Sequence, residues 1–194
     1  KIEESLNESL KYHGYDNKVS SDKVRQGIGY SLVDYANLVY DFIDNEDERI
    51  NLVHDADIFR NKIISEKGSD TYPNFKETFI NLSKNYKTGI VSNCGANTIE
   101  TLVDVLHIDN YVTDFIAASK CNMTKAEAIK KIAEDNNAKK YIYIGDTILD
   151  KKSSELAGAD FIHAAYGFGK IDNVKFSIKE LNELPSVIKK MESL

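Results

Sequence analysis

Two aspartates that follow an apolar run are well suited to hold a divalent cation. Residues 141–145, YIYIG, are rich in aromatic and β-branched side chains and predict a buried parallel strand, and Asp146 comes directly after them. Asp150 follows four residues later, at the start of a predicted helix, so both carboxylates can face one crevice. Mg²⁺ prefers oxygen ligands of this kind, which water and substrate phosphate complete. The alternative is an ordinary helix start with a solvated aspartate.

A serine at the end of a second apolar run could donate to a phosphoryl group. Ser92 closes the run TGIVS, and Asn93 is the next residue. A hydroxyl at a strand end, together with the following backbone N–H, can donate hydrogen bonds to phosphoryl oxygens. The alternative is an ordinary serine in a turn.

A lysine at the predicted start of a helix could neutralise the same group. Residues 124–127, TKAE, have the T-x-x-E form of a capping box, which places Lys125 on the first helical turn. A positive charge is unfavourable at a helix N-terminus. The conflict is resolved if the ammonium points at a bound anion. The alternative is a solvated surface lysine, like its neighbours Lys130 and Lys131.

These candidate residues fall in a part of the chain where predicted strands and helices alternate. Such alternation favours parallel strands covered by helices on both faces, with the strand ends at one edge. The predicted helices are 74–85, 97–106, 125–136 and those after 148 and about 178, and the predicted strands are 87–92, 114–118, 141–145 and 161–165.

The first 70 residues are predicted to be helices only. Ile2, Leu6, Leu10 and Tyr12 form one apolar face at helical spacing. A longer helix is predicted over residues 46–67. Its expected buried side is Ile50, Val53, Ile58, Phe59 and Ile63. Helices gathered before an alternating part favour a helical subdomain, residues 1–70, that precedes an α/β unit, residues 71–194.

Composition narrows the classes of partner. The net charge is −6 and the pI about 5.3, and no Lys/Arg stripe stands out, which argues against a nucleic-acid polymer. No apolar run reaches the 18 residues of a membrane span, so no membrane partner is expected. Cys94 and Cys121 show no disulfide or metal spacing, and a reducing cytoplasm is the expected location. The oligomeric state stays open.

Taken together, the candidate residues resemble a known family. The order of Ser92, Lys125 and Gly145-Asp146 to Asp150 resembles the second, third and fourth motifs of the haloacid dehalogenase-like (HAD) phosphatases, in the phosphoglycolate-phosphatase-like branch. Residues 1–70 resemble the helical C1 cap of that family. The resemblance implies an HAD-like Rossmannoid α/β fold, a parallel sheet flanked by helices, with a small all-α cap.

The resemblance also implies a function. A protein of this kind hydrolyses a small-molecule phosphomonoester with Mg²⁺ through an aspartyl-phosphate. Ser92, Lys125 and Asp146 would be catalytic, with Ser92, Asn93 and Lys125 on the phosphoryl group. The metal residues would be Asp146 and Asp150, with Asp146 as a ligand and Asp150 orienting a metal-bound water or the Asp146 loop.

One motif of the family is absent from the sequence. The first motif supplies the nucleophilic aspartate from a strand in the middle of the sheet, in strand order 5-4-1-2-3. Asp55 and Asp57 have its D-x-D spacing but lie within a helical pattern. Without that strand, its neighbours would keep unpaired edges. The hypotheses are a segment that precedes Lys1 in the native protein, or a chain that is catalytically dead, and the sequence as given is expected to be inactive.

The sequence leaves open two alternative functions and the roles of two short glycine-containing segments. A sugar phosphomutase would use the same intermediate, and a phosphate-binding or regulatory domain, such as a response-regulator receiver, would place similar residues around Mg²⁺. The helical first part argues against a receiver. Residues 166–169, YGFG, form either a loop that closes over the site or a glycine-rich turn. Residues 27–29, GIG, resemble a substrate-facing part of the cap.

Overall fold

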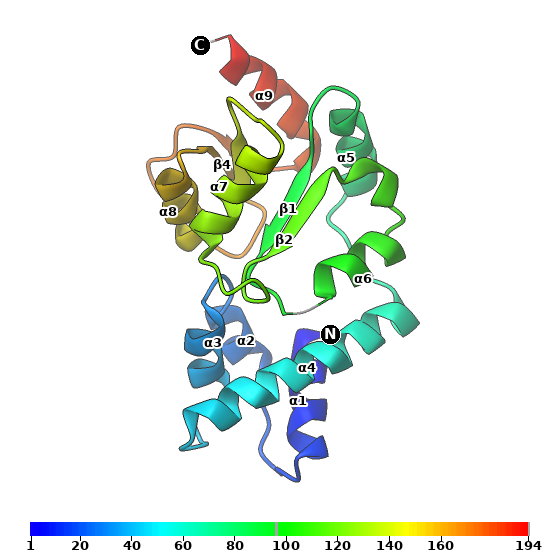
Figure 1. The fold of residues 1–194 in the computed structure, drawn as a ribbon, viewed down its shortest axis with the longest axis vertical. Helices are drawn as coiled ribbons and strands as arrows, with labels where there is room; N and C mark the ends of the chain where they lie inside the picture. The colour runs from blue at the N-terminus through cyan, green and yellow to red at the C-terminus, as the bar shows by residue number, and fades with distance from the viewer. Residues whose placement is uncertain (96, 194) are drawn as a thin grey trace.

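The computed structural model describes residues 1–95 and 97–193, and its first part is a helical region, residues 2–67. Each of its last three helices begins at a residue whose side chain accepts a backbone N–H, namely Ser20, Ser31 and Asn45, which satisfies an otherwise unpaired donor. Buried apolar residues, among them Leu6, Leu10, Tyr40 and Leu52, hold the helices together. The helices are α1 (Ile2–Tyr12), α2 (Ser21–Gln26), α3 (Leu32–Val39) and α4 (Glu46–Lys67) (Figure 1).

Helix α4 has the predicted bounds but a different buried side. Val53 and Ile63 are buried as expected, whereas Ile58 is 67% exposed. Asp57, one residue earlier, is only 6% exposed. The expectation was wrong because α4 packs against α1 and α3 and also against α6 (Thr98–Val105), so its buried residues do not form one apolar stripe.

Tyr12 is a second exception in the helical region. It was predicted on the apolar face of α1 but is 74% exposed at the end of that helix, where its ring packs edge-on against Phe59.

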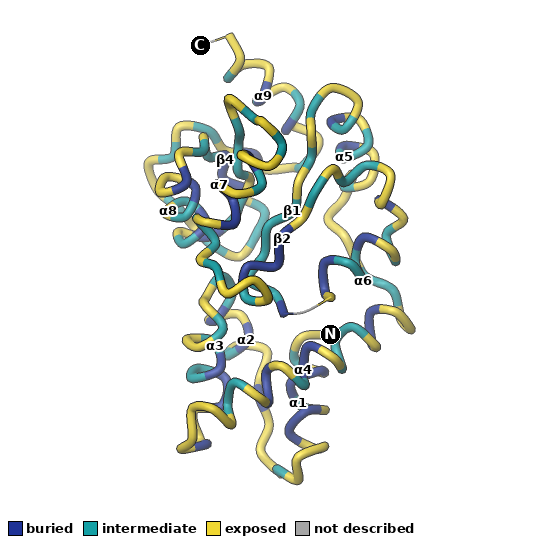
Figure 2. The backbone as a smooth tube through the Cα atoms, viewed as in Figure 1, coloured by how far each residue is buried: buried dark blue, intermediate teal, exposed yellow. Residues whose placement is uncertain are grey.

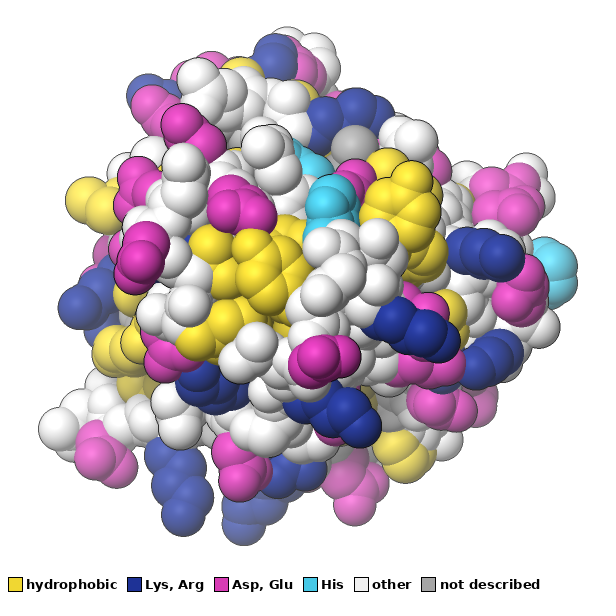
Figure 3. All heavy atoms as spheres, turned by 90° about the horizontal axis from the view of Figure 1, so that it is seen from below, with side chains coloured by type: hydrophobic (Ala, Val, Ile, Leu, Met, Phe, Trp, Pro, Cys, Tyr) yellow, Lys and Arg dark blue, Asp and Glu magenta, His cyan; other side chains and the backbone are white. Residues whose placement is uncertain are grey.

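Figure 2 shows buried positions along α1 and α4, and Figure 3 shows hydrophobic side chains gathered on the face seen from below. Among the helices of the described part, none combines the length and apolar content needed to cross a bilayer.

The rest of the chain alternates strands and helices as predicted. The strands are parallel and follow the predicted runs within a few residues. The further elements are α5 (Phe75–Ser83), β1 (Gly89–Ser92), η1 (Asp109–Tyr111), β2 (Asp114–Ala117), α7 (Lys125–Asp135), β3 (Ile142–Gly145), α8 (Ile148–Ala157), β4 (Asp160–Ala164), β5 (Ser177–Ile178), η2 (Leu181–Glu183) and α9 (Leu184–Glu192).

Within the described ranges the strands form two separate sheets, β1-β2 and β3-β4-β5. The edges of β1 and β3 meet through a side chain, because Tyr143 Oη donates to the Val91 carbonyl over 3.3 Å. The prediction that β3 is buried on both faces was wrong, since Ile144 is 36% exposed. The reason is that, among the described strands, β3 pairs only with β4, and Ile144 lines the cavity at the end of β3.

Candidate active site

The ends of β1 and β3, the start of α7 and part of the helical region line one cavity of about 350 Å³. All five residues singled out in the sequence line it: Ser92, Asn93, Lys125, Asp146 and Asp150. They come from three segments that are far apart along the chain. The structure therefore brings the predicted site residues together, as the shared edge of parallel strands requires.

Lys125 and Asp150 form a buried ion pair in this cavity. The capping box of Thr124 and Glu127 starts α7 at Lys125, as predicted. Lys125 Nζ lies 2.6 Å from Asp150 Oδ1, and both side chains are largely buried. The unfavourable position of a lysine on the first helical turn is thus offset by a carboxylate from α8.

Asp150 also organises the loop that carries Asp146. Its Oδ2 accepts hydrogen bonds from the backbone N–H of Asp146 (3.3 Å) and from the N–H and hydroxyl of Thr147 (3.0 and 2.8 Å). Burial alone would raise the pKa of the Asp150 carboxyl, but Lys125 and Thr147 outweigh it and lower that pKa below its usual range. Both oxygens of Asp150 are therefore already engaged by the protein.

The lowered pKa of Asp150 predicts a pH dependence of stability. The pKa in the folded state lies below the reference value of 3.8. The ionised carboxylate therefore makes its full contribution to the free energy of unfolding when the pH is above 3.8, and this contribution disappears as the pH falls through the folded-state pKa. We expect the difference in free energy of unfolding between the wild type and Asp150→Asn to shrink between about pH 5 and the acid limit. Urea unfolding across this range measures it, and a constant difference would contradict the assignment.

The side chain of Asp146 is held by the loop of residues 166–169. The Phe168 N–H donates to Asp146 Oδ2 over 2.6 Å. A Cβ at Gly167 would lie 2.3 Å from Asp146 Cβ, and one at Gly169 would lie 2.3 Å from the Asp146 carbonyl oxygen. The loop therefore packs directly on Asp146, which requires glycine at both positions.

We expect Gly167→Ala to destabilise the protein by about 1–3 kcal/mol, because the added methyl group overlaps Asp146 and must displace the loop. Gly89→Ala is the matched control, since its nearest contact would be an ordinary 3.4 Å to Ile132. Chemical denaturation of both variants compares them. Equal stability of the two would show that the loop yields without cost.

Ser92 and Asn93 connect the end of β1 to the helical region. Ser92 Oγ accepts the Cys94 N–H over 3.2 Å, and this hydrogen bond does not use the proton of the Ser92 hydroxyl. The Asn93 amide donates to the carbonyls of Gly29 (3.2 Å) and Tyr30 (3.0 Å). The GIG segment of the sequence thus lies against the candidate phosphate-binding loop.

The cavity lining also includes Tyr35, Asp57 and Arg60, which were not predicted as site residues from the sequence. Arg60 NH2 lies 2.5 Å from Asp57 Oδ1, one helical turn away, and also donates to Thr98 over 3.0 Å. Burial raises the pKa of the Asp57 carboxyl, against the effect of Arg60. The only sign of this pair in the sequence was the spacing of Asp57 and Arg60, an acidic and a basic residue three positions apart inside an apolar helical pattern. Asp55 lies elsewhere, paired with His13, so the two aspartates of the D-x-D do not act together.

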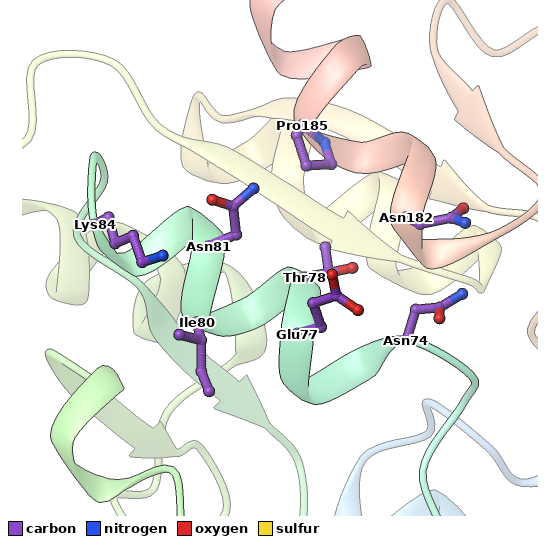
Figure 4. A pocket seen from close by; sticks show the side chains of 8 residues that line it. All are labelled: Asn74, Glu77, Thr78, Ile80, Asn81, Lys84, Asn182 and Pro185. Carbon is purple, nitrogen blue, oxygen red and sulfur yellow. The ribbon is translucent and has the colours of Figure 1, made fainter.

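A second cavity of about 540 Å³ contains none of these residues. It lies between α5 and the start of α9, and side chains such as Asn81, Lys84 and Asn182 surround it (Figure 4). Most of its lining is exposed and polar. The smaller cavity, not this one, holds the buried ion pair and the converging donors.

Comparisons with known proteins agree with the fold. The model of the family "Haloacid dehalogenase-like hydrolase" matches residues 1–164. No curated protein sequence matches the chain.

Among solved structures, a HAD-superfamily hydrolase of subfamily IA from Geobacter sulfurreducens is 16% identical, with 95% of this chain and 91% of that chain covered and a TM-score of 0.69. A candidate phosphoglycolate phosphatase from Lactobacillus plantarum is 14% identical, with 95% and 89% covered and a TM-score of 0.78. CbbY from Rhodobacter sphaeroides, solved with phosphate, is 9% identical, with 94% and 88% covered and a TM-score of 0.78. These similarities confirm an α/β HAD-like fold with parallel sheets flanked by helices and a helical region. With the family model matching most of its length, the chain belongs to the haloacid dehalogenase-like hydrolases.

Proposed function

We propose that the cavity between the strand ends and the helical region is the site of a Mg²⁺-dependent phosphatase that acts on a small phosphomonoester. The observation that carries the proposal is the convergence of the Ser92 hydroxyl, the Lys125 ammonium and the Asp146 carboxylate on one cavity. A hydroxyl, a cation and a metal-binding carboxylate are the groups that bind and neutralise a phosphoryl group. Among the structural relatives, CbbY was solved with phosphate.

The contacts of the residues support the roles that we propose for them. Lys125, held by Asp150, would donate to phosphoryl oxygens, while Ser92 Oγ and the Asn93 N–H would orient them. We infer that residues 1–70 act as a cap over the core, residues 71–194, and exclude bulk water. The Asn93 amide, bonded to Gly29 and Tyr30, would keep the cap near the phosphate-binding loop.

The donor set fits Mg²⁺. No three His, Cys, Asp or Glu side chains of the described ranges gather closely enough to hold a metal by themselves. Mg²⁺ does not need such a cage, since it keeps several waters and binds through one or two carboxylates and substrate phosphate. Asp146 would be the carboxylate ligand, with Asp150 orienting its loop. When bound, the ion would neutralise phosphoryl charge.

The proposal includes one negative expectation. The family's chemistry needs a nucleophilic aspartate, and no residue of this sequence matches its motif. We therefore expect residues 1–194 to bind phosphate and Mg²⁺ but to release no phosphate from a panel of phosphomonoesters. Release at an enzymatic rate would contradict this expectation and would require a nucleophile within the chain.

Calorimetric titration of the chain with inorganic phosphate in the presence of Mg²⁺ tests the site. We expect binding that Lys125→Met abolishes and that Lys130→Met leaves unchanged, because Lys130 lies exposed on the same helix and pairs with Glu134. Absence of phosphate binding by the wild type, or equal binding by both variants, would refute the proposed function.

A further inference from the structure

The candidate phosphate-binding loop, residues 92–95, is held from two sides. The core holds it at Asn93, whose carbonyl oxygen accepts a hydrogen bond from the Ser119 hydroxyl over 2.8 Å. The helical region holds it at Gly95. A Cβ at Gly95 would lie 1.4 Å from Asp57 Oδ2, so this carboxylate occupies the space that a side chain would need. Asp57 therefore contacts the loop directly.

The Asp57 carboxylate is itself held by Arg60. Arg60 Nη2 lies 2.5 Å from Asp57 Oδ1 and also donates to Thr98 Oγ1 over 3.0 Å. The Thr98 hydroxyl in turn donates to the side-chain oxygen of Asn61 over 3.0 Å. Asp57, Arg60 and Asn61 belong to α4, whereas Thr98 is the buried first residue of α6. The ion pair thus joins the helical region both to the loop and to the helix that follows it.

The start of α6 depends on groups from elsewhere in the chain. The side chain of Asn97, which precedes α6, makes no capping hydrogen bond within the described part of the chain, and its oxygen accepts from Lys120 over 3.1 Å. A carboxylate near a helix N-terminus is favourable, because the first N–H groups of a helix lack partners within it. Asp57 places such a charge beside Gly95, whose carbonyl accepts the Thr98 N–H over 3.4 Å.

The pair is better suited to fix a geometry than to add stability. Burial raises the pKa of the Asp57 carboxyl, although Arg60, His54 and the Gly95 N–H act to lower it. A buried ion pair often adds little net stability compared with apolar residues of the same volume. Its contacts are directional, however, and here they reach Gly95 on one side and Thr98 on the other.

Resting on the proposed function, we propose that Asp57 and Arg60 are positioning residues that set the geometry of the loop of residues 92–95, and with it the direction of the Asn93 N–H toward the phosphoryl group. Neither side chain has to touch the phosphate. A donor that is held in place before the ligand arrives loses little freedom on binding, which strengthens the complex. The helical region then does more than cover the cavity, because full phosphate affinity requires α4 to be docked on the loop.

The double variant Asp57→Asn with Arg60→Met tests the inference. It removes one charge of each sign, so the net charge beside the cavity is unchanged, and it removes the donor to Thr98. We expect calorimetric titration with inorganic phosphate in the presence of Mg²⁺ to show about tenfold weaker binding than in the wild type. The affinity for Mg²⁺ without phosphate should stay the same, because Asp146 is held by the separate loop of residues 166–169.

Lys62→Met with Glu66→Gln is the matched control. These two residues form an exposed pair of opposite charges on the same helix, 3.9 Å apart, and are not among the described residues that line the cavity. Both affinities of the control should equal those of the wild type. In the ligand-free proteins, the amide NMR resonance of Asn93 should shift in the first double variant and not in the control. A role of the ion pair in stability alone would leave that resonance unchanged.

A milder variant decides the question if the first double variant does not fold. Thr98→Val preserves the shape of a buried side chain and removes only the hydroxyl that links Arg60 to Asn61. It is expected to weaken phosphate binding about threefold and to leave the Mg²⁺ affinity unchanged. Thermal unfolding of each variant identifies those that are folded at the temperature of the titration.

The outcomes distinguish the inference from the proposed function. If the wild type binds phosphate and the folded double variant, or Thr98→Val in its place, binds it as tightly, the inference is refuted and the proposed function stands. The same holds if the control loses as much affinity. Equal losses of phosphate and Mg²⁺ affinity would also refute the inference, since they would indicate a general disturbance of the site. If the wild type itself does not bind phosphate, the proposed function fails and the inference fails with it.

Discussion

Replacing Lys125 by methionine is expected to lower the free energy of unfolding by about 3–5 kcal/mol. Methionine keeps the volume of the lysine stem but leaves the buried Asp150 carboxylate without its partner at 2.6 Å. Removal of one partner from a buried pair is costly because the remaining charge keeps its desolvation penalty. Urea unfolding of the wild type and the variant at neutral pH measures the difference.

The double variant Lys125→Met with Asp150→Asn is the decisive control. Asparagine can still accept from Thr147 through its side-chain oxygen but carries no charge, so most of the lost stability should return. The double variant should nevertheless fail to bind inorganic phosphate, since the ammonium is gone. If Lys125→Met alone is as stable as the wild type, water must reach the Asp150 carboxylate. If the double variant still binds inorganic phosphate, Lys125 is not part of the phosphate-binding site.

Replacing Asp146 by asparagine is expected to weaken Mg²⁺ binding at least about 100-fold with little effect on stability. The change removes the negative charge of the proposed metal ligand. Its effect on Mg²⁺ affinity should therefore exceed the roughly tenfold to 100-fold loss that is typical when a residue outside the coordination shell is replaced. Stability should persist because an asparagine oxygen can still accept the Phe168 N–H. Calorimetric titration with MgCl₂ measures the affinity.

Asp160→Asn serves as the comparison for this variant, because Asp160 begins β4 and does not line the cavity. Its Mg²⁺ affinity should equal that of the wild type. If Asp146→Asn binds Mg²⁺ as well as Asp160→Asn does, the metal is held elsewhere. Loss of stability in Asp146→Asn without loss of affinity would assign Asp146 a structural role in anchoring the loop of residues 166–169.

The sequence was sufficient to predict four of the five described strands, though not β5, and the convergence of the motif residues. Apolar runs that end in Ser92 or in Gly145-Asp146 predicted parallel strands, and the T-x-x-E pattern predicted the start of α7 at Lys125. These signals are local, since capping and strand propensity depend on a few neighbouring residues. The shared edge of parallel strands then brings the motif residues together without further information.

The sequence was insufficient where packing partners decide the outcome. Ile58 was predicted to be buried but is exposed, whereas Asp57 was not predicted to be buried but is. Periodicity failed here because it does not reveal that α4 contacts both the other helices of the helical region and α6. The engagement of both Asp150 oxygens and the cavity position of Tyr35 likewise depend on residues distant in the chain. Such contacts follow from tertiary structure and not from spacing.

The two hydrogen bonds from the Asn93 amide to the carbonyls of Gly29 and Tyr30 have a consequence for ligand exchange. The same residue also accepts a hydrogen bond at its carbonyl oxygen from Ser119 over 2.8 Å, which fixes it to the loop after β2. A hinge motion that lifts the helices away must therefore break contacts to the very residue that follows Ser92. Admission of a ligand and adjustment of its anchoring amides would then be one coupled event, and the rate of opening would limit how fast a bound anion leaves.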